Sequence, residues 1–76
     1  MVEKYKLGKK LAILYNNRER ITRLNYSTIL ELGMSGYWYY ILRGVLKSAE
    51  AIDEDGNVNW DKVLLLLEQL RKELAV

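Results

Sequence analysis

The side chains that most often carry out chemistry in proteins are scarce in this chain. It contains no histidine and no cysteine, which removes the commonest general base and the thiolate ligands of metal sites. Serine, tyrosine and lysine are present, but none stands in a motif that would activate it as a nucleophile. Neighbouring carboxylates occur around Asp53 and Asp55, in a segment that we interpret as a solvated turn. We therefore expect no enzymatic activity, no metal and no cofactor.

The acidic segment shares part of the pattern of a calcium-binding loop. Asp and Asn alternate on either side of Gly56, as they do in such loops. When Gly56 is aligned with the invariant glycine, the first ligand position falls on Ala51 and the last on Lys62. Neither side chain supplies a carboxylate oxygen, so we do not expect calcium here.

Charged residues are distributed unevenly along the chain, although the net charge is only +2. Residues 1–48 hold nine Lys or Arg and three Asp or Glu, a balance of +6, whereas residues 49–76 hold three and seven, a balance of −4. A basic half predicts a polyanionic partner, with the acidic half turned elsewhere. The basic residues that we expect to contact phosphates are Lys9, Lys10, Arg18, Arg20 and Arg23.

The length of 76 residues predicts one domain, residues 1–76, with one small core that is marginal alone. Apolar periodicity and capping residues predict helices over residues 3–17, 26–32, 36–48 and 60–75. Apolar residues also flank the turn dipeptide Asp55-Gly56, which allows a small β-hairpin at about 50–60. We therefore expect a mainly α-helical domain of three or four helices, with or without this hairpin.

Residues 27–44, STILELGMSGYWYYILRG, combine a short helix, a turn and a longer helix. Gly33 stands at the turn, with Met34 and Ser35 before the second helix. This stretch resembles the helix-turn-helix of small repressors and Cro-like proteins, and with the hairpin the chain resembles winged helix-turn-helix regulators. The resemblance implies a transcriptional regulator that binds specific sites on double-stranded DNA with helix 36–47 in the major groove. The hairpin would be the wing, and its acidic tip, Glu54-Asp55, would be repelled by phosphate.

A helical wheel of this second helix supports a functional outer face. At ~100° per residue, the inward face is expected to hold Met34, Trp38, Ile41, Leu42 and Val45. The opposite face has no acidic residue, and its Arg43 is suited to reading a guanine edge. Gly36 and Gly44 would let a DNA backbone approach closely. The residues of this segment that we expect to contact DNA are Ser35, Gly36, Tyr37, Tyr40, Arg43 and Lys47.

The last predicted helix carries more leucine than one small core requires. We expect it to close the core and also to pair with a second copy of the chain. The residues expected at this dimer interface are Leu64, Leu67, Leu70 and Leu74. A homodimer would place two reading helices on a palindromic site.

Other functions remain open. The aromatic run Tyr37 to Tyr40 could form a protein–protein interface, since Tyr and Trp are enriched at binding hot spots. A basic, aromatic helix could also lie on a membrane surface, but the remaining helices have the pattern of a globular core. No apolar run approaches the ~18 residues that cross a bilayer. We therefore expect a cytoplasmic protein without a membrane partner, and its Lys, Glu, Leu and Tyr content suggests a thermophilic source.

Overall fold

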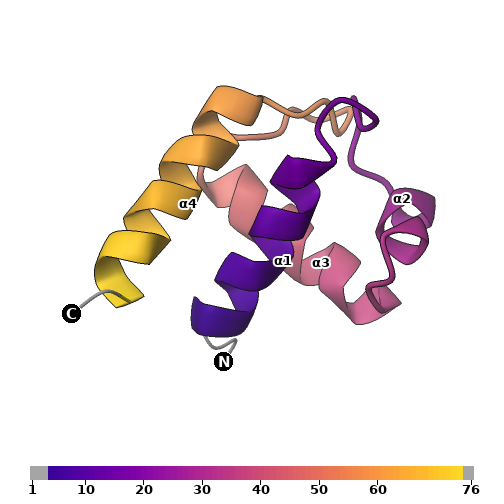
Figure 1. Cartoon of the computed structure of the whole chain (residues 1–76). Helices are drawn as coiled ribbons and strands as arrows, with labels where there is room; N and C mark the ends of the chain where they lie inside the picture. Colours follow the sequence, from indigo (N-terminus) through magenta and orange to yellow (C-terminus); the bar gives the residue numbers. More distant parts are fainter. Residues whose placement is uncertain (1–3, 75–76) are drawn as a thin grey trace.

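A computed structural model describes residues 4–74 as a mainly helical domain with four helices. They are α1 (Lys4–Asn16), α2 (Tyr26–Glu31), α3 (Gly36–Ser48) and α4 (Trp60–Leu74). Helix α1 packs against α4, and α2 packs against α3 (Figure 1). The predicted mainly α-helical class is confirmed, and the helix bounds agree to within a residue or two. Residues 3 and 75, which the predicted first and last helices included, lie outside the described residues.

The core is formed by apolar side chains from all four helices and from the connections between them. Leu11 and Leu14 of α1 are fully buried, as the apolar stripe of that helix predicts. Ile21 and Leu24 fix the connection between α1 and α2, since both are buried as well. Among the described residues no polar or charged side chain is buried, so burial of apolar surface is what holds the domain together.

Local side-chain and backbone interactions define both the start of α2 and the turn that joins it to α3. Asn25 caps the start of α2, because its side-chain oxygen accepts a hydrogen bond of 2.8 Å from the backbone N–H of Thr28. Gly33 follows the helix with φ of 82°. The N–H of Gly33 donates to Leu30 O at 3.0 Å, and the N–H of Met34 donates to Ile29 O at 3.2 Å. This pair of bonds is a Schellman motif, which ends α2 and sets the direction of α3.

Helix α3 ends in a second Schellman motif, which is built around Glu50 rather than a glycine. Glu50 has φ of 56°. Its N–H donates to Lys47 O at 3.0 Å, and the N–H of Ala51 donates to Leu46 O at 2.7 Å. The chain thereby folds back over the end of α3, and Ala51 and Leu46 are both fully buried.

Two short extended segments that follow this turn pair with each other, and the second also pairs with a third, residues 22–24, that precedes α2. Ile52 forms an antiparallel bridge with Val58, and Arg23 forms one with Asn57. The N–H of Leu24 donates to Gly56 O at 2.8 Å, and the N–H of Asn59 donates to Ala51 O at 2.7 Å. Residues 56–59 therefore lie between residues 22–24 and residues 51–53. Within residues 4–74 these pairings remain isolated bridges, without a continuous strand.

A single carboxylate organises the turn at residues 53–57. The Oδ1 atom of Asp53 accepts hydrogen bonds of 2.9 Å from the backbone N–H groups of Asp55 and Asn57. Its Oδ2 atom accepts one of 3.1 Å from the Asn57 side chain. The side-chain bond from Asn57, followed by the backbone bonds, lowers the pKa of Asp53 below its ordinary value of 3.8. Gly56, with φ of 85°, completes the reversal of the chain.

Candidate nucleic-acid interface

The two sides of α3 differ sharply in exposure. Leu42 and Leu46 are fully buried, whereas Tyr37 and Tyr40 are 67% and 65% exposed. Arg43, Gly44, Lys47 and Ser48 are exposed on the same outer side as the two tyrosines. No acidic residue occurs between Ser35 and Ser48. The outer side of α3 is therefore a surface of aromatic rings, hydroxyl groups and two cations.

The predicted inner face of α3 was partly wrong. Met34 and Leu42 are buried as expected, but Ile41 and Val45 are only half-buried. Leu46 is fully buried instead. It lies one helical turn after Leu42, about 40° away on the helical wheel, so the buried face is turned toward Leu46 relative to the predicted one.

Aromatic rings continue from α2 onto the N-terminal half of α3. The rings of Tyr26 and Tyr39 meet edge to face with centroids 5.7 Å apart, and those of Tyr39 and Tyr40 are 5.2 Å apart. Tyr37 and Trp38 make a similar pair at 6.3 Å. These contacts hold the exposed rings of Tyr37 and Tyr40 against half-buried neighbours. The exposed aromatic surface is thus fixed in position by the packing beneath it.

Gly36 does not provide the close approach that was predicted for it. It is half-buried, and a Cβ atom at this position would lie 2.7 Å from ring carbons of Tyr26. The ring of Tyr26 occupies that place and is itself 46% exposed. Tyr26 is therefore a surface residue that the sequence pattern did not predict. Gly44 does remain open, since a Cβ there would meet no atom within 4 Å.

The two predicted phosphate-binding lysines of α1 point in different directions. The Lys10 ammonium group lies over the Trp38 ring, 5.4 Å from its centroid, which brings a positive charge next to α3. The Lys9 ammonium lies 4.9 Å from the Tyr5 centroid instead. Lys9 lines an apolar cleft between α1 and α4 together with Leu67 and Leu70. The structure therefore brings Lys10, but not Lys9, next to α3, where it lies over the half-buried Trp38 rather than on the outer side of the helix.

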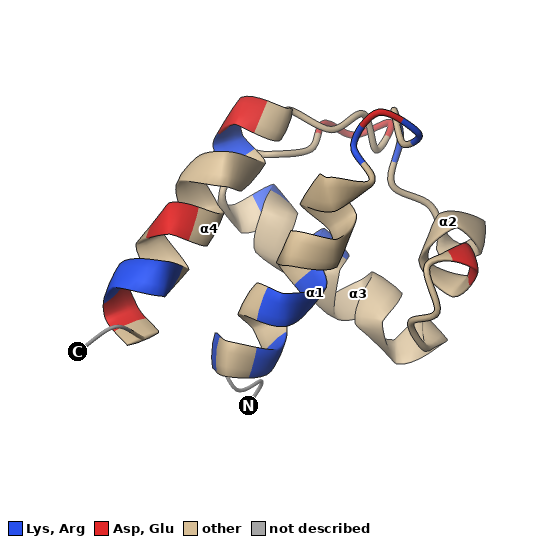
Figure 2. Ribbon diagram, in the orientation of Figure 1, with Lys and Arg blue, Asp and Glu red and all other residues tan. Residues whose placement is uncertain are grey.

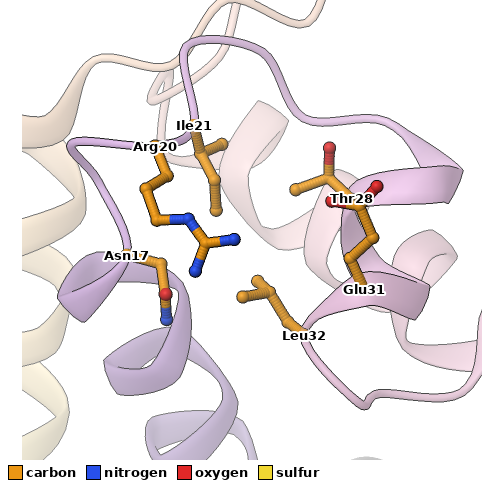
Figure 3. Close-up of a pocket in the computed structure, with 6 residues that line it drawn as sticks. All are labelled: Asn17, Arg20, Ile21, Thr28, Glu31 and Leu32. Carbon is orange, nitrogen blue, oxygen red and sulfur yellow. The ribbon is translucent and has the colours of Figure 1, made fainter.

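The three arginines between α1 and α2 form a separate basic group near the acidic turn (Figure 2). The guanidinium group of Arg18 lies 4.3 Å from the centroid of the Tyr15 ring and donates a hydrogen bond to Tyr15 O at 3.1 Å. Arg23 pairs through its backbone with Asn57. Arg20 extends into a pocket whose other lining residues are Asn17, Ile21, Thr28, Glu31 and Leu32 (Figure 3). All three are exposed, and none of these contacts involves α3.

The cationic edge of α3 faces carboxylates. Arg43 and Lys47 line the same groove as Asp53, Glu54 and Asp55. The ion pairs of the described residues are Lys4–Glu73 at 2.9 Å and Lys62–Glu50 at 3.7 Å, so neither cation of α3 is held in one. Both cations are exposed and able to contact a ligand, with negative charge close on one side.

The opposite edge of α3 is uncharged. An open groove between α3 and α4 is lined by Tyr40, Ile41, Gly44, Val45, Ser48, Ala49 and Leu66. Since no charged residue lines it, this edge suits apolar groups of a ligand.

The predicted dimer interface on α4 needs correction. Leu67 and Leu70 are 4% and 6% exposed and belong to the core of a single chain, where α4 packs on α1. They are therefore not available to a second copy. Leu64 is half-buried, Leu74 is 45% exposed and Leu65, which was not assigned to the interface, is 64% exposed. The exposed leucines do not form the continuous stripe that the spacing suggested.

The described part of the chain contains no cluster of three or more acidic side chains placed to hold a metal ion. None of the described helices has the length and apolar character needed to cross a membrane.

Comparisons with protein-family models, with curated proteins and with solved structures gave no match. The function must therefore be argued from the geometry and chemistry of the chain itself.

Proposed function

We propose that the chain binds double-stranded DNA, with α3 in the major groove, and acts as a small transcriptional regulator that occludes its site. The observation that carries this proposal is the outer face of α3. It is exposed, contains no acidic residue, and is held on a rigid turn after α2. A helix presented in this way fits a major groove ~12 Å wide.

The order and pairing of the elements support the proposal. A helix, a short extended segment, two helices joined by a tight turn, and a paired turn follow one another along the chain. This is the order of elements in winged helix-turn-helix domains, which the sequence resembles. The pairing of residues 22–24 with residues 56–58 fixes α2, and therefore α3, against the turn at residues 53–57. On this proposal that turn is a short wing.

The charged residues near α3 favour DNA binding on its outer side, and they restrict the direction from which DNA can approach. Arg43 and Lys47 are exposed on α3, and Lys10 lies beside Trp38. Phosphates attract these cations but repel Glu54 and Asp55 at the tip of the turn. The DNA backbone is therefore expected to pass by the aromatic end of α3 and α1, and to stay clear of the acidic tip.

The first test is the fluorescence anisotropy of a labelled random-sequence duplex, titrated with the protein at low and at moderate salt. We expect binding with a dissociation constant of about 10⁻⁶–10⁻⁴ M that weakens steeply as salt rises, because counterions are released from the phosphates. Absence of binding at low salt would contradict the proposal.

A pair of double variants locates the binding surface. Replacing Arg43 and Lys47 with alanine should weaken binding about tenfold or more and reduce the salt slope by about one for each phosphate that is no longer neutralised. Replacing Arg71 and Lys72 with alanine removes the same charge from the last turn of α4. Equal weakening in the two variants would show that net charge, rather than α3, determines binding.

A protein–protein interface is the second candidate, because Tyr37 and Tyr40 are exposed beside an uncharged groove. Salt separates the two functions, since an aromatic interface changes little as ionic strength rises. A partner protein whose affinity is insensitive to salt, together with no binding to duplex DNA, would favour this second candidate.

A further inference from the structure

The exposed side chains of α3 limit what the helix can recognise. Those that face outward are Tyr37, Tyr40, Arg43, Gly44, Lys47 and Ser48. Asn, Gln, Asp and Glu are all missing between Ser35 and Ser48. Asn and Gln are the side chains that bind adenine with two hydrogen bonds, and Asp and Glu are those that accept from cytosine. The helix therefore has no side chain that pairs with adenine through two hydrogen bonds, and no carboxylate to accept from the cytosine amino group.

What remains is chemistry for guanine and for thymine. The guanidinium group of Arg43 can donate two hydrogen bonds to O6 and N7 of guanine. Thymine differs from the other bases in the major groove by its C5-methyl group, which binds apolar surface. The uncharged groove beside Gly44 offers such a surface, because Tyr40, Ile41 and Val45 line it.

The space at Gly44 is open, so a methyl group can approach the helix there. No atom lies within 4 Å of the place where a Cβ would stand. Tyr40, one helical turn earlier, is 65% exposed, and its ring is held by Tyr39 at 5.2 Å. The fixed ring therefore forms a wall beside an open glycine.

We propose that α3 selects duplexes in which thymine and guanine are neighbours, with the thymine methyl group in the hollow at Gly44 beside Tyr40 and guanine bound by Arg43. This inference rests on the proposed function and names the bases that its binding surface recognises. Tyr40 and Arg43 are one helical turn apart on the exposed side of α3, so adjacent bases of one strand are within their reach.

The test uses one duplex with two single-group base analogues. One strand repeats thymine-guanine and the other repeats cytosine-adenine. Replacing every thymine with uracil removes only the methyl groups, and replacing every guanine with 7-deazaguanine removes only the N7 acceptors. Both changes leave the number of phosphates unaltered. Dissociation constants are measured by anisotropy at one fixed salt concentration.

We expect uracil to weaken binding about fourfold for each methyl group that is contacted, and 7-deazaguanine to weaken it at least as much. Tyr40→Ala should abolish the difference between thymine and uracil, while Tyr40→Phe, which keeps the ring, should retain it. Arg43→Ala should abolish the effect of 7-deazaguanine alone. Leu65→Ala, on the exposed side of α4, should change neither ratio.

The outcomes distinguish this inference from the function on which it rests. Salt-dependent binding that is equal for the thymine and uracil duplexes would overturn the inference and leave DNA binding intact. No binding to any duplex would overturn both. Circular dichroism of each variant confirms that the helices are retained, which is expected because Tyr40 and Arg43 are exposed.

Discussion

Two turns flank α3, and they hold its ends by different chemistry. The turn before α3 contains Gly33, whose left-handed backbone suits a residue without a Cβ atom. The turn after α3 has the same pair of Schellman hydrogen bonds, yet places Glu50 in the left-handed position. The first turn is uncharged, whereas the second leads into a segment that depends on the Asp53 carboxylate and carries further negative charge.

The two turns differ in backbone strain: the turn at Gly33 is relaxed, whereas the turn at Glu50 is strained and lies next to charged residues. At the first turn, residue type and conformation agree, so the geometry between α2 and α3 costs little. At the second turn a non-glycine residue in the left-handed region costs about 1–2 kcal/mol. The chain accepts this cost where Glu50 pairs with Lys62 at 3.7 Å and the acidic turn approaches Arg43 and Lys47.

Gly56→Ala, in the turn at residues 53–57 that follows the second Schellman turn, is expected to have the largest effect on stability. A Cβ there would lie 2.9 Å from the backbone oxygen of Leu24, and φ is 85°. The strain and the forced separation from residue 24 should lower the free energy of unfolding by about 2–3 kcal/mol. Urea denaturation followed by circular dichroism measures it. A smaller destabilisation than that of Gly33→Ala would show that the backbone contact is unimportant.

Gly33→Ala should destabilise the domain less, by about 1–2 kcal/mol, because only the left-handed backbone is at issue. No atom lies within 4 Å of the added Cβ. Gly8→Ala is the matched control, since it adds the same methyl group within α1, also in open space. The control should gain about 0.5–1 kcal/mol. A gain of stability in Gly33→Ala, like that expected for the control, would show that the turn does not require a left-handed residue.

Glu50→Gly should place a glycine in the left-handed position of the second turn, as Gly33 is in the first. It relieves the left-handed strain and should raise the free energy of unfolding by about 0.5–1 kcal/mol. The ion pair that it removes is solvent-exposed and contributes little. Lys62→Ala removes the same ion pair without changing the backbone, and thermal unfolding compares the two variants. A loss of stability in Glu50→Gly would mean that the strain at this turn is negligible.

Acid should weaken the turn at residues 53–57, which follows the second Schellman turn, but not the turn at Gly33. The pKa of Asp53 is below its ordinary value of 3.8 in the folded chain, because the charged form accepts hydrogen bonds from Asn57 and from backbone N–H groups. Its stabilising contribution is therefore present above the unfolded value and is lost as pH falls through the lower folded value. Asp53→Asn should be less stable than the parent near neutral pH, and the difference should shrink in acid. A difference that is constant with pH would show that the charge of Asp53 does not stabilise the turn.

The smallest expected effect concerns affinity rather than stability. Replacing Glu54 with Gln and Asp55 with Asn removes two charges near the cationic edge of α3. Each change should improve binding to a duplex about twofold at low salt, from a Coulomb energy of ~0.4 kcal/mol at ~10 Å in water. Glu68→Gln on α4 is the control for net charge. Improvement by the control alone would place the DNA on another face.

The local features of this fold could be predicted from the sequence. Asn25 and Gly33 mark the ends of α2, because a cap and a left-handed residue are properties of single side chains. Contacts between distant segments could not. The covering of Gly36 by Tyr26 and the pairing of Leu24 with Gly56 both require the tertiary arrangement.

In the candidate site, too, local properties could be predicted from the sequence, whereas contacts between helices could not. Exposure of Tyr37, Tyr40, Arg43 and Lys47 follows from helical periodicity and agrees with the structure. The number of basic residues in α1 does not show which of them lie near α3. Lys9 and Lys10 are adjacent in sequence, yet Lys9 lines the cleft with α4 and Lys10 lies over Trp38 of α3. The spacing of Val63, Leu67 and Leu70 places them on one face of α4, and their burial against α1 agrees with the expected role of this helix in closing the core. Their further assignment to a dimer interface was wrong, because the core of a single chain already occupies them.

The packing of α1 against α4 also determines when the protein can fold during its synthesis. Leu11 and Leu14 are synthesised more than fifty residues before Leu67 and Leu70. Until then the nascent chain shows the apolar side of α1 to solvent and to chaperones. The α2–α3 pair depends on nearby residues, and such local contacts form quickly. We therefore expect the helical pair to fluctuate early on the ribosome, while stable folding awaits the synthesis of α4.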